Sequence, residues 1–321
     1  MARERSQRNA VVFGTALVLT LVLLFRTNWH VGKHPAHTAA GGTSPSITAS
    51  PSSTASPESS TPAAASTKKM SPPPPTHAQL VAAATAKVKA LAKGWPSGGI
   101  SVAEVNISTG ASYHYGPSTG MWTASVYKLF VLETLLVQNG GPLSGVEAEQ
   151  ATTMIENSDN VAGYALFEAA GGRAGLSKGA ASLGLKHTIP GVADPTFTNT
   201  GAADMLTLLR NLTHSGPLNA ASRNYALRLM RNVEGDQRWG VGVVADKGTT
   251  FANKNGWLSI DNDNGPDEDD DGRWVVNSLG IVTVHGHEVL MAVMTEHGPD
   301  FQTGVDLVQS LSRAIIGAVA A

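Results

Sequence analysis

Strand-like and helix-like segments are segregated along this chain, and their order constrains the fold more than any other feature. Within residues 78–321, strand patterns occur near the beginning and again near the end, whereas residues 124–231 show only helical periodicity. Strands from both ends of a domain can complete one sheet when the helical middle is an insertion. We therefore predict a fold that mixes helices and strands, α/β in the broad sense and α+β in the strict sense. It has an antiparallel sheet of about five strands, terminal helices that flank it, and an inserted all-helical lobe, with a cleft between the lobes.

The individual elements follow from periodicity and from the residues that interrupt it. A first helix is predicted at Gln79–Lys93, followed by a hairpin around Thr109-Gly110, and a final helix carries an apolar stripe. The hairpin strands are Ile100–Asn106 and Ser112–Tyr115, and the later strands Thr250–Leu258, Trp274–Val284 and Glu288–Thr295. The middle helices are Ser125–Gln138, Val146–Glu156, Asn160–Ala169, Leu176–Leu183, Gly201–Thr213 and Leu218–Arg231, and the final stripe is Val305, Val308, Leu311, Ile315 and Val319.

The first 77 residues are predicted to lie outside this domain. Residues 1–26 hold three arginines before an apolar run, Ala10–Phe25, which suits a transmembrane signal anchor or a cleaved signal peptide. The positive charge favours an N-terminus in the cytoplasm and export of everything after Arg26. Residues 27–77 are rich in Pro, Ser, Thr and Ala and predict a disordered tether to a domain at 78–321. The expected location is the cell membrane, single-pass with the C-terminal domain outside, or secretion after cleavage.

Composition excludes several classes of function. Lys and Arg number 23 against 25 for Asp and Glu, a net charge of -2, so no basic field for nucleic acid is present. The chain has no cysteine, which excludes disulfides, cysteine-ligated zinc, a thiol nucleophile and a lipid-modified cysteine. We expect no cofactor and no metal, and the sequence does not give the oligomeric state.

A serine and a lysine at helical spacing are the first candidates for chemistry. Ser125-Val126-Tyr127-Lys128 places a hydroxyl and an amine one turn apart at a predicted helix start, where a neutral lysine could activate the serine. The pattern is weak alone, because Ser66-Thr67-Lys68-Lys69 in the tether also matches it. By itself, the pair is equally compatible with a polar helix start.

Two further motifs follow in an informative order. Ser158-Asp159-Asn160 lies between helical segments, and Lys254-Asn255-Gly256 lies on a strand pattern. Each has an ordinary alternative, a helix N-cap and a strand ending in a turn. Together with Ser125 and Lys128 they follow the order S-x-x-K, S-D-N and K-T-G. Over residues 78–321 the chain therefore resembles the penicillin-recognising serine enzymes, above all class A β-lactamase-like serine hydrolases, and the resemblance implies the β-lactamase/transpeptidase-like fold.

The resemblance also implies residue roles. Ser125 would be the acylated nucleophile, Lys128 its base partner, and Ser158 the proton relay to the leaving nitrogen. Oxyanion donors would be the backbone N–H groups of Ser125 and Trp257. The substrate contacts would come from Asn160, Lys254 for the carboxylate, Asn255, Gly256 for close approach of the substrate backbone, and Trp257, which adjoins the strand motif and would line the cleft.

The chain departs from the family in three places. No E-x-x-L-N motif follows S-D-N, and the only acid between Glu168 and Asp204 is Asp194, which is either a water-activating deacylation base or a turn residue. Asn255 replaces the usual Thr, and the stretch from Lys128 to Ser158 is short. These departures weaken the prediction of efficient β-lactam hydrolysis more than they weaken the prediction of an acyl-enzyme.

Other polar groups have simpler interpretations. Within the acidic insertion 261–272, Asp267–Gly272 resembles the start of a calcium loop, but Ser278 occupies the twelfth position instead of Glu, which favours a solvated hairpin tip. His285, His287 and His297 have no metal-ligand spacing. Trp95, Trp122 and Trp239 are expected to be packing residues.

The sequence thus predicts an exported serine hydrolase that forms an acyl-enzyme on Ser125 with β-lactams or related amides and esters. One alternative is a D,D-peptidase or penicillin-binding protein with slow deacylation, acting on a peptidoglycan-like peptide. Another is a non-catalytic domain of the same fold that binds cell-wall ligands.

Overall fold

The computed structural model describes residues 73–214, 216–260 and 272–320. The predicted anchor, nearly all of the predicted tether and the acidic insertion up to residue 271 lie outside these ranges. Within them, no helix has the length and apolar character needed to cross a membrane.

A five-stranded antiparallel sheet organises the domain, as predicted. Its strand order is β2-β1-β7-β6-β5, so the first and last parts of the chain meet at the β1–β7 pair. The edge strand β5 pairs with β6 in a register that places Gly256 opposite Asn277. The strands are β1 (Ile100–Asn106), β2 (Ser112–Tyr115), β5 (Ala252–Ser259), β6 (Trp274–Val284) and β7 (His287–Gly298).

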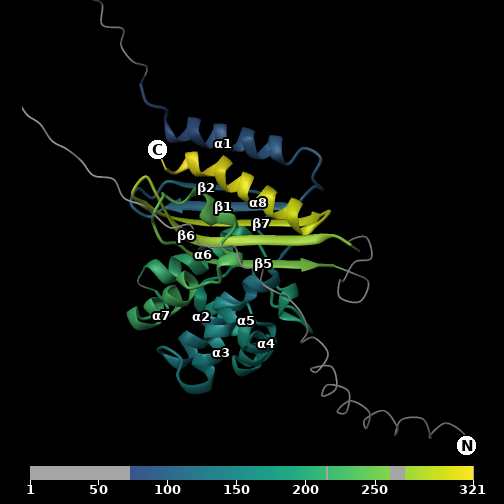
Figure 1. The fold of residues 1–321 in the computed structure, drawn as a ribbon, viewed down its shortest axis with the longest axis vertical. Helices are drawn as coiled ribbons and strands as arrows, with labels where there is room; N and C mark the ends of the chain where they lie inside the picture. Colours follow the sequence, from purple (N-terminus) through teal and green to yellow (C-terminus); the bar gives the residue numbers. More distant parts are fainter. Residues whose placement is uncertain (1–72, 215, 261–271, 321) are drawn as a thin grey trace, which may run out of the picture. The chain divides into compact units, whose positions relative to one another are not determined.

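Helices α1 (His77–Leu91) and α8 (Phe301–Ile315) cover one face of this sheet (Figure 1). A capping box between Thr76 and Gln79 begins α1. The predicted stripe of α8 is buried against the sheet, although the helix ends at Ile315 and Val319 lies beyond it.

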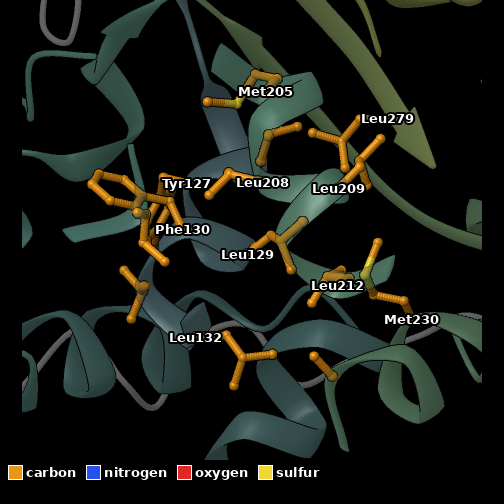
Figure 2. Packing of buried hydrophobic residues seen from close by; sticks show 14 of the residues in the cluster. Tyr127, Leu129, Phe130, Leu132, Met205, Leu208, Leu209, Leu212, Met230 and Leu279 are labelled. Atoms are coloured by element: carbon orange, nitrogen blue, oxygen red, sulfur yellow. The ribbon is translucent and has the colours of Figure 1, made fainter. Parts of the chain in front are cut away.

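The helical lobe lies against the other face (Figure 1). Its central helix, α2 (Tyr127–Asn139), is buried on almost all sides and ends at Gly140, which has the left-handed conformation favoured by glycine. Figure 2 shows Leu129 and Leu132 of α2 in the same core as Leu208, Leu209 and Leu212. The other helices of the lobe are α3 (Gly145–Glu156), α4 (Asn160–Ala169), α5 (Gly172–Leu183), α6 (Ala202–Thr213) and α7 (Ala220–Arg231).

A second, two-stranded sheet was not predicted. Strand β4 (Asn199–Thr200) lies inside the region expected to be free of strands and pairs with β3 (Met121–Trp122). Both strands are two residues long, too short to show alternation in the sequence. Their pairing attaches the loop that follows α5 to the segment that precedes Ser125.

Candidate active site

Ser125 lies in a tight turn immediately before α2. The turn is a 3₁₀ helix, Ala124–Val126, so Ser125 precedes the helix that was predicted to begin with it. Ala124 has a φ of 43°, in the left-handed region that is costly for a residue with a side chain. The nucleophile candidate is therefore presented by strained backbone.

The Lys128 amine lies within hydrogen-bond distance of the predicted site residues. Its Nζ is 3.0 Å from Ser125 Oγ, 2.7 Å from Asn160 Oδ1, and 2.6 Å and 3.3 Å from the carbonyl oxygen and Oγ of Ser158. Burial lowers the pKa of Lys128 to about 8, although Asp159 opposes this shift. About one tenth of this amine is thus neutral at pH 7, with a lone pair that can accept the Ser125 proton.

Lys254 approaches Ser158 from strand β5. Its Nζ donates to Ser158 Oγ at 2.8 Å and to the carbonyl oxygen of Asn255 at 2.9 Å. Burial, and then the charge of Lys128, hold its pKa well below the usual range. The Ser158 hydroxyl therefore joins two buried amines, an arrangement through which a proton can pass.

The S-D-N segment is fixed by its own capping interactions. Asp159 is the N-cap of α4, and its carboxylate accepts the N–H of Ala162 at 2.7 Å. Ser158 has a φ of 58°, which turns its carbonyl oxygen and hydroxyl toward Lys128. The capping alternative for this motif is correct for Asp159, while Ser158 and Asn160 are in the site.

Gly256 is required for a reason that the sequence did not reveal. A Cβ on Gly256 would lie 2.8 Å from the backbone nitrogens of Ser125 and Val126 and from the carbonyl oxygen of Thr123. The glycine thus lets the backbone of the serine turn lie directly on β5. The sequence analysis expected the backbone of a substrate to approach Gly256 closely. In this structure the backbone of residues 123–126 approaches Gly256 closely.

The side chains of Asn255 and Trp257 face away from Ser125, so the structure does not bring them together with the other predicted site residues. Asn255 is fully buried and donates both amide hydrogens, to the carbonyl oxygens of Gln237 at 2.8 Å and Trp239 at 3.1 Å. The Trp257 ring lies with those of Trp239 and Phe301, at centroid distances of 5.9 and 5.6 Å. Alternate residues of a strand point to opposite faces, so both lie on the side opposite Gly256.

Asp194 acts as a turn and capping residue in this structure. Its Oδ1 accepts the N–H and hydroxyl of Thr196 at 2.8 and 2.7 Å, and its Oδ2 accepts the hydroxyl of Tyr164 at 2.7 Å. Both carboxylate oxygens are therefore engaged. Of the two interpretations of Asp194, this geometry favours the turn residue.

Two buried residues that the sequence analysis missed contact the backbone just before Ser125. Asn277 of β6 donates to the carbonyl oxygens of Trp122 and Thr123, and Glu296 of β7 accepts the N–H of Trp122. A polar residue inside an apolar strand was the available signal, but the sequence does not say what it contacts.

Metal sites are not apparent in the parts of the chain that the structure describes. No group of three or more potential ligands occurs among those residues. His285 bonds the carbonyl oxygen of Ala320 through Nδ1 at 2.9 Å, and His297 lies 3.9 Å from a carboxylate oxygen of Glu296. The calcium-loop pattern lies outside the described residues except for Gly272.

Comparisons with known proteins agree with the fold. The profile of the "Beta-lactamase enzyme family" matches residues 147–319. A PBP-A mutant, solved as an acyl-enzyme complex with penicillin G, is 22% identical with a TM-score of 0.60, covering 72% of this chain and 94% of that chain. A class A β-lactamase from Mycobacterium abscessus is 17% identical with a TM-score of 0.60, covering 73% and 98%. A β-lactamase from Desulfarculus baarsii is 18% identical with a TM-score of 0.59, covering 73% and 96%. No curated protein sequence matches.

Proposed function

Since this chain belongs to the β-lactamase enzyme family, we propose that it is a serine hydrolase that forms an acyl-enzyme on Ser125 with β-lactams or related amides and esters. The observation that carries the proposal is the 3.0 Å contact between Lys128 Nζ and Ser125 Oγ, made by a buried lysine whose pKa is lowered to about 8. A base near the operating pH beside a hydroxyl is what nucleophilic catalysis requires.

Acylation would proceed by three proton transfers. Ser125 Oγ attacks the carbonyl carbon while its proton passes to neutral Lys128, and the C–N or C–O bond of the substrate then breaks. The leaving nitrogen or oxygen takes a proton from Ser158, which recovers one from the adjacent amines, 3.3 and 2.8 Å away. The backbone N–H groups of Ser125 and Trp257 would stabilise the oxyanion, because Gly256 brings β5 against the serine turn.

Penicillin-binding behaviour is a second candidate, favoured by the contacts of Asp194. A carboxylate that already accepts from Thr196 and Tyr164 is a poor match for a free water-activating base. The acyl-enzyme would then persist, as expected of a D,D-peptidase or penicillin-binding protein. The PBP-A mutant that resembles this fold was solved as such an acyl-enzyme with penicillin G.

Intact-mass spectrometry of the purified full-length chain with penicillin G tests the proposal. We expect an adduct with the mass of the intact antibiotic, which is absent from Ser125→Ala and retained by Ser66→Ala, the serine of the other S-x-x-K match. Decay of the adduct over minutes would indicate hydrolysis, and persistence over hours would indicate penicillin binding. An adduct that survives Ser125→Ala would contradict the assignment. A chain that binds a wall peptide without any adduct would be a non-catalytic binding domain.

We also propose, from the sequence, that the folded domain lies outside the cytoplasm. The arginines before residue 10 and the apolar run Ala10–Phe25 support an anchor with the folded domain outside the cytoplasm. Protease added to intact spheroplasts should remove the domain, whereas a cytoplasmic domain would be protected. Recovery of the domain in the culture medium would indicate a cleaved signal peptide.

A further inference from the structure

Two buried polar side chains hold the backbone of Trp122 from opposite sides. Asn277 is 1% exposed and Glu296 is 5% exposed, and they come from the neighbouring central strands β6 and β7 (Figure 1). Glu296 accepts the Trp122 N–H through Oε1, and Asn277 donates to the Trp122 carbonyl oxygen at 2.7 Å. Trp122 is thus fixed through both of its backbone polar groups, three residues before Ser125.

The amide of Asn277 makes two further hydrogen bonds. Its second hydrogen reaches the carbonyl oxygen of Thr123 at 3.1 Å, and its oxygen accepts the N–H of Thr295 at 3.1 Å. Only this orientation of the amide pairs donors with acceptors, because the opposite one would face oxygen to oxygen. A buried amide whose three hydrogen bonds are made in only one orientation is a rigid link between the sheet and the serine turn.

The turn needs such links because its backbone is strained. A non-glycine residue at positive φ is energetically costly, and the conformation persists when the surrounding structure imposes it. Ala124, with a φ of 43°, lies directly between the fixed residues Trp122–Thr123 and Ser125. Without Asn277, the turn could relax and move Ser125 Oγ away from Lys128.

We propose that Asn277 and Glu296 are positioning residues for Ser125, holding the strained serine turn on the sheet so that its hydroxyl faces Lys128. Neither touches the reacting atoms. The inference rests on the proposed function for its catalytic consequence, but the positioning itself is a property of the backbone. It therefore has a test that does not depend on acylation.

Asn277→Asp is the central variant, because it keeps the oxygen that accepts from Thr295 and removes both donated hydrogen bonds. Asn106→Asp is the matched control. Asn106 is also 1% exposed, donates to a backbone carbonyl oxygen (Val319, 3.0 Å) and accepts backbone N–H groups, on β1 beside the C-terminal segment. Both variants should lose stability, because each removes an amide donor from a buried backbone carbonyl oxygen.

The first readout is the acylation rate constant at saturating penicillin G. We expect Asn277→Asp to lower it about 10–100-fold, the scale of a misplaced catalytic group. The affinity of the initial complex should stay within about 3-fold, and the pH midpoint of acylation should not move, because Lys128 is untouched. Asn106→Asp should acylate at the wild-type rate. An unchanged rate in Asn277→Asp, or an equal loss in Asn106→Asp, would overturn the proposal.

The second readout is hydrogen–deuterium exchange of the peptide that spans residues 119–127. Exchange should rise in Asn277→Asp and not in Asn106→Asp, whether or not the wild type is acylated. If wild-type protein forms no adduct, the proposed function fails and exchange alone decides the positioning. Equal exchange in the two variants would refute it.

Glu296 provides an independent pair of variants in case Asn277→Asp does not fold. Glu296→Gln keeps an oxygen for the Trp122 N–H and should retain acylation within about 3-fold, whereas Glu296→Leu removes it and should show the loss expected of Asn277→Asp. Equal behaviour of Gln and Leu at this position would contradict a role through that hydrogen bond.

Discussion

Buried ionisable side chains have different surroundings in two regions of this molecule. At the candidate site, Lys128 and Lys254 are fully buried, and each donates to several oxygens. On the other face of the sheet, Glu104 of β1 is equally buried, and neither carboxyl oxygen has a hydrogen-bond partner among the described residues. Its register partners Tyr113 and Met291 belong to the apolar core under α1 and α8.

Burial shifts the pKa values of these groups toward the neutral form in both regions. It lowers the pKa of Lys128 to about 8 and raises that of Glu104 to about 8. The difference lies in what the neutral group contacts. A neutral lysine beside a serine hydroxyl is a usable base, whereas a neutral glutamic acid among apolar side chains has nothing to act on. Perturbed pKa values therefore indicate a functional site only together with reactive neighbours.

The largest effect should come from removing the neutral state of Lys128. Arginine stays charged at all accessible pH values, so Lys128→Arg should lower acylation by about 10³-fold or more. Stopped-flow acylation by a fluorescent penicillin measures this rate. Lys87→Arg, on the exposed face of α1, is the control and should behave as wild type. Acylation of Lys128→Arg within 10-fold of wild type would show that Lys128 is not the base.

Glu104 should contribute to the dependence of the stability of the domain on pH. Between the usual pKa near 4.5 and the raised value of about 8, the folded state retains a proton that the unfolded state has lost. Raising the pH through this window therefore destabilises the fold, by about 1.4 kcal/mol per pH unit at most and about 2–4 kcal/mol between pH 5 and 8. Glu104→Gln, which has no proton to lose, should remove this component from urea unfolding.

The control for that experiment is Glu149→Gln, on an exposed position of α3. It should leave the pH dependence as in wild type. If Glu104→Gln and wild type lose stability in parallel from pH 5 to 8, Glu104 is not the buried acid that sets this dependence.

The pH profile of acylation tests the candidate site, the region that contains Lys128. Because the neutral fraction of Lys128 rises with pH through a pKa of about 8, the rate should increase with pH and level off above that value. At pH 6 the rate should be about 100-fold below its plateau, and at pH 7 about 10-fold below. Single-turnover acylation from pH 5.5 to 9.5 measures the profile. A flat profile from pH 6 to 9 would mean that no group with this pKa governs acylation.

The features that could be predicted from the sequence are those that depend on neighbouring residues in the chain. The order of elements and the three motifs predicted the five-stranded sheet, which is confirmed, and selected Ser125, Lys128, Ser158, Asn160 and Lys254, which the structure brings together. Their catalytic roles remain predictions. These residues carry recognisable spacings, because each motif spans only three or four consecutive residues.

Contacts that depend on distant parts of the chain could not be predicted. Which face of β5 receives Asn255 and Trp257 depends on register, and a shift of one residue would exchange the two faces. Asn277 and Glu296 contact backbone groups more than 150 residues away. Every residue has a backbone C=O group, and every residue except proline has a backbone N–H group, so no sequence pattern marks such partners.

Asp194 should give the smallest effect. Asp194→Asn keeps an oxygen for the N–H and hydroxyl of Thr196 and loses one acceptor for Tyr164. If Asp194 is only a capping residue, this change should lower the free energy of unfolding by about 1 kcal/mol or less. Asp300→Asn is matched to it, because Asp300 caps α8 and accepts the N–H and hydroxyl of Thr303 at 2.8 and 2.7 Å. Both variants should release a penicillin adduct within about 3-fold of the wild-type rate. A deacylation rate at least about 100-fold lower in Asp194→Asn alone would assign Asp194 as the base that activates water, since general-base catalysis contributes on that scale.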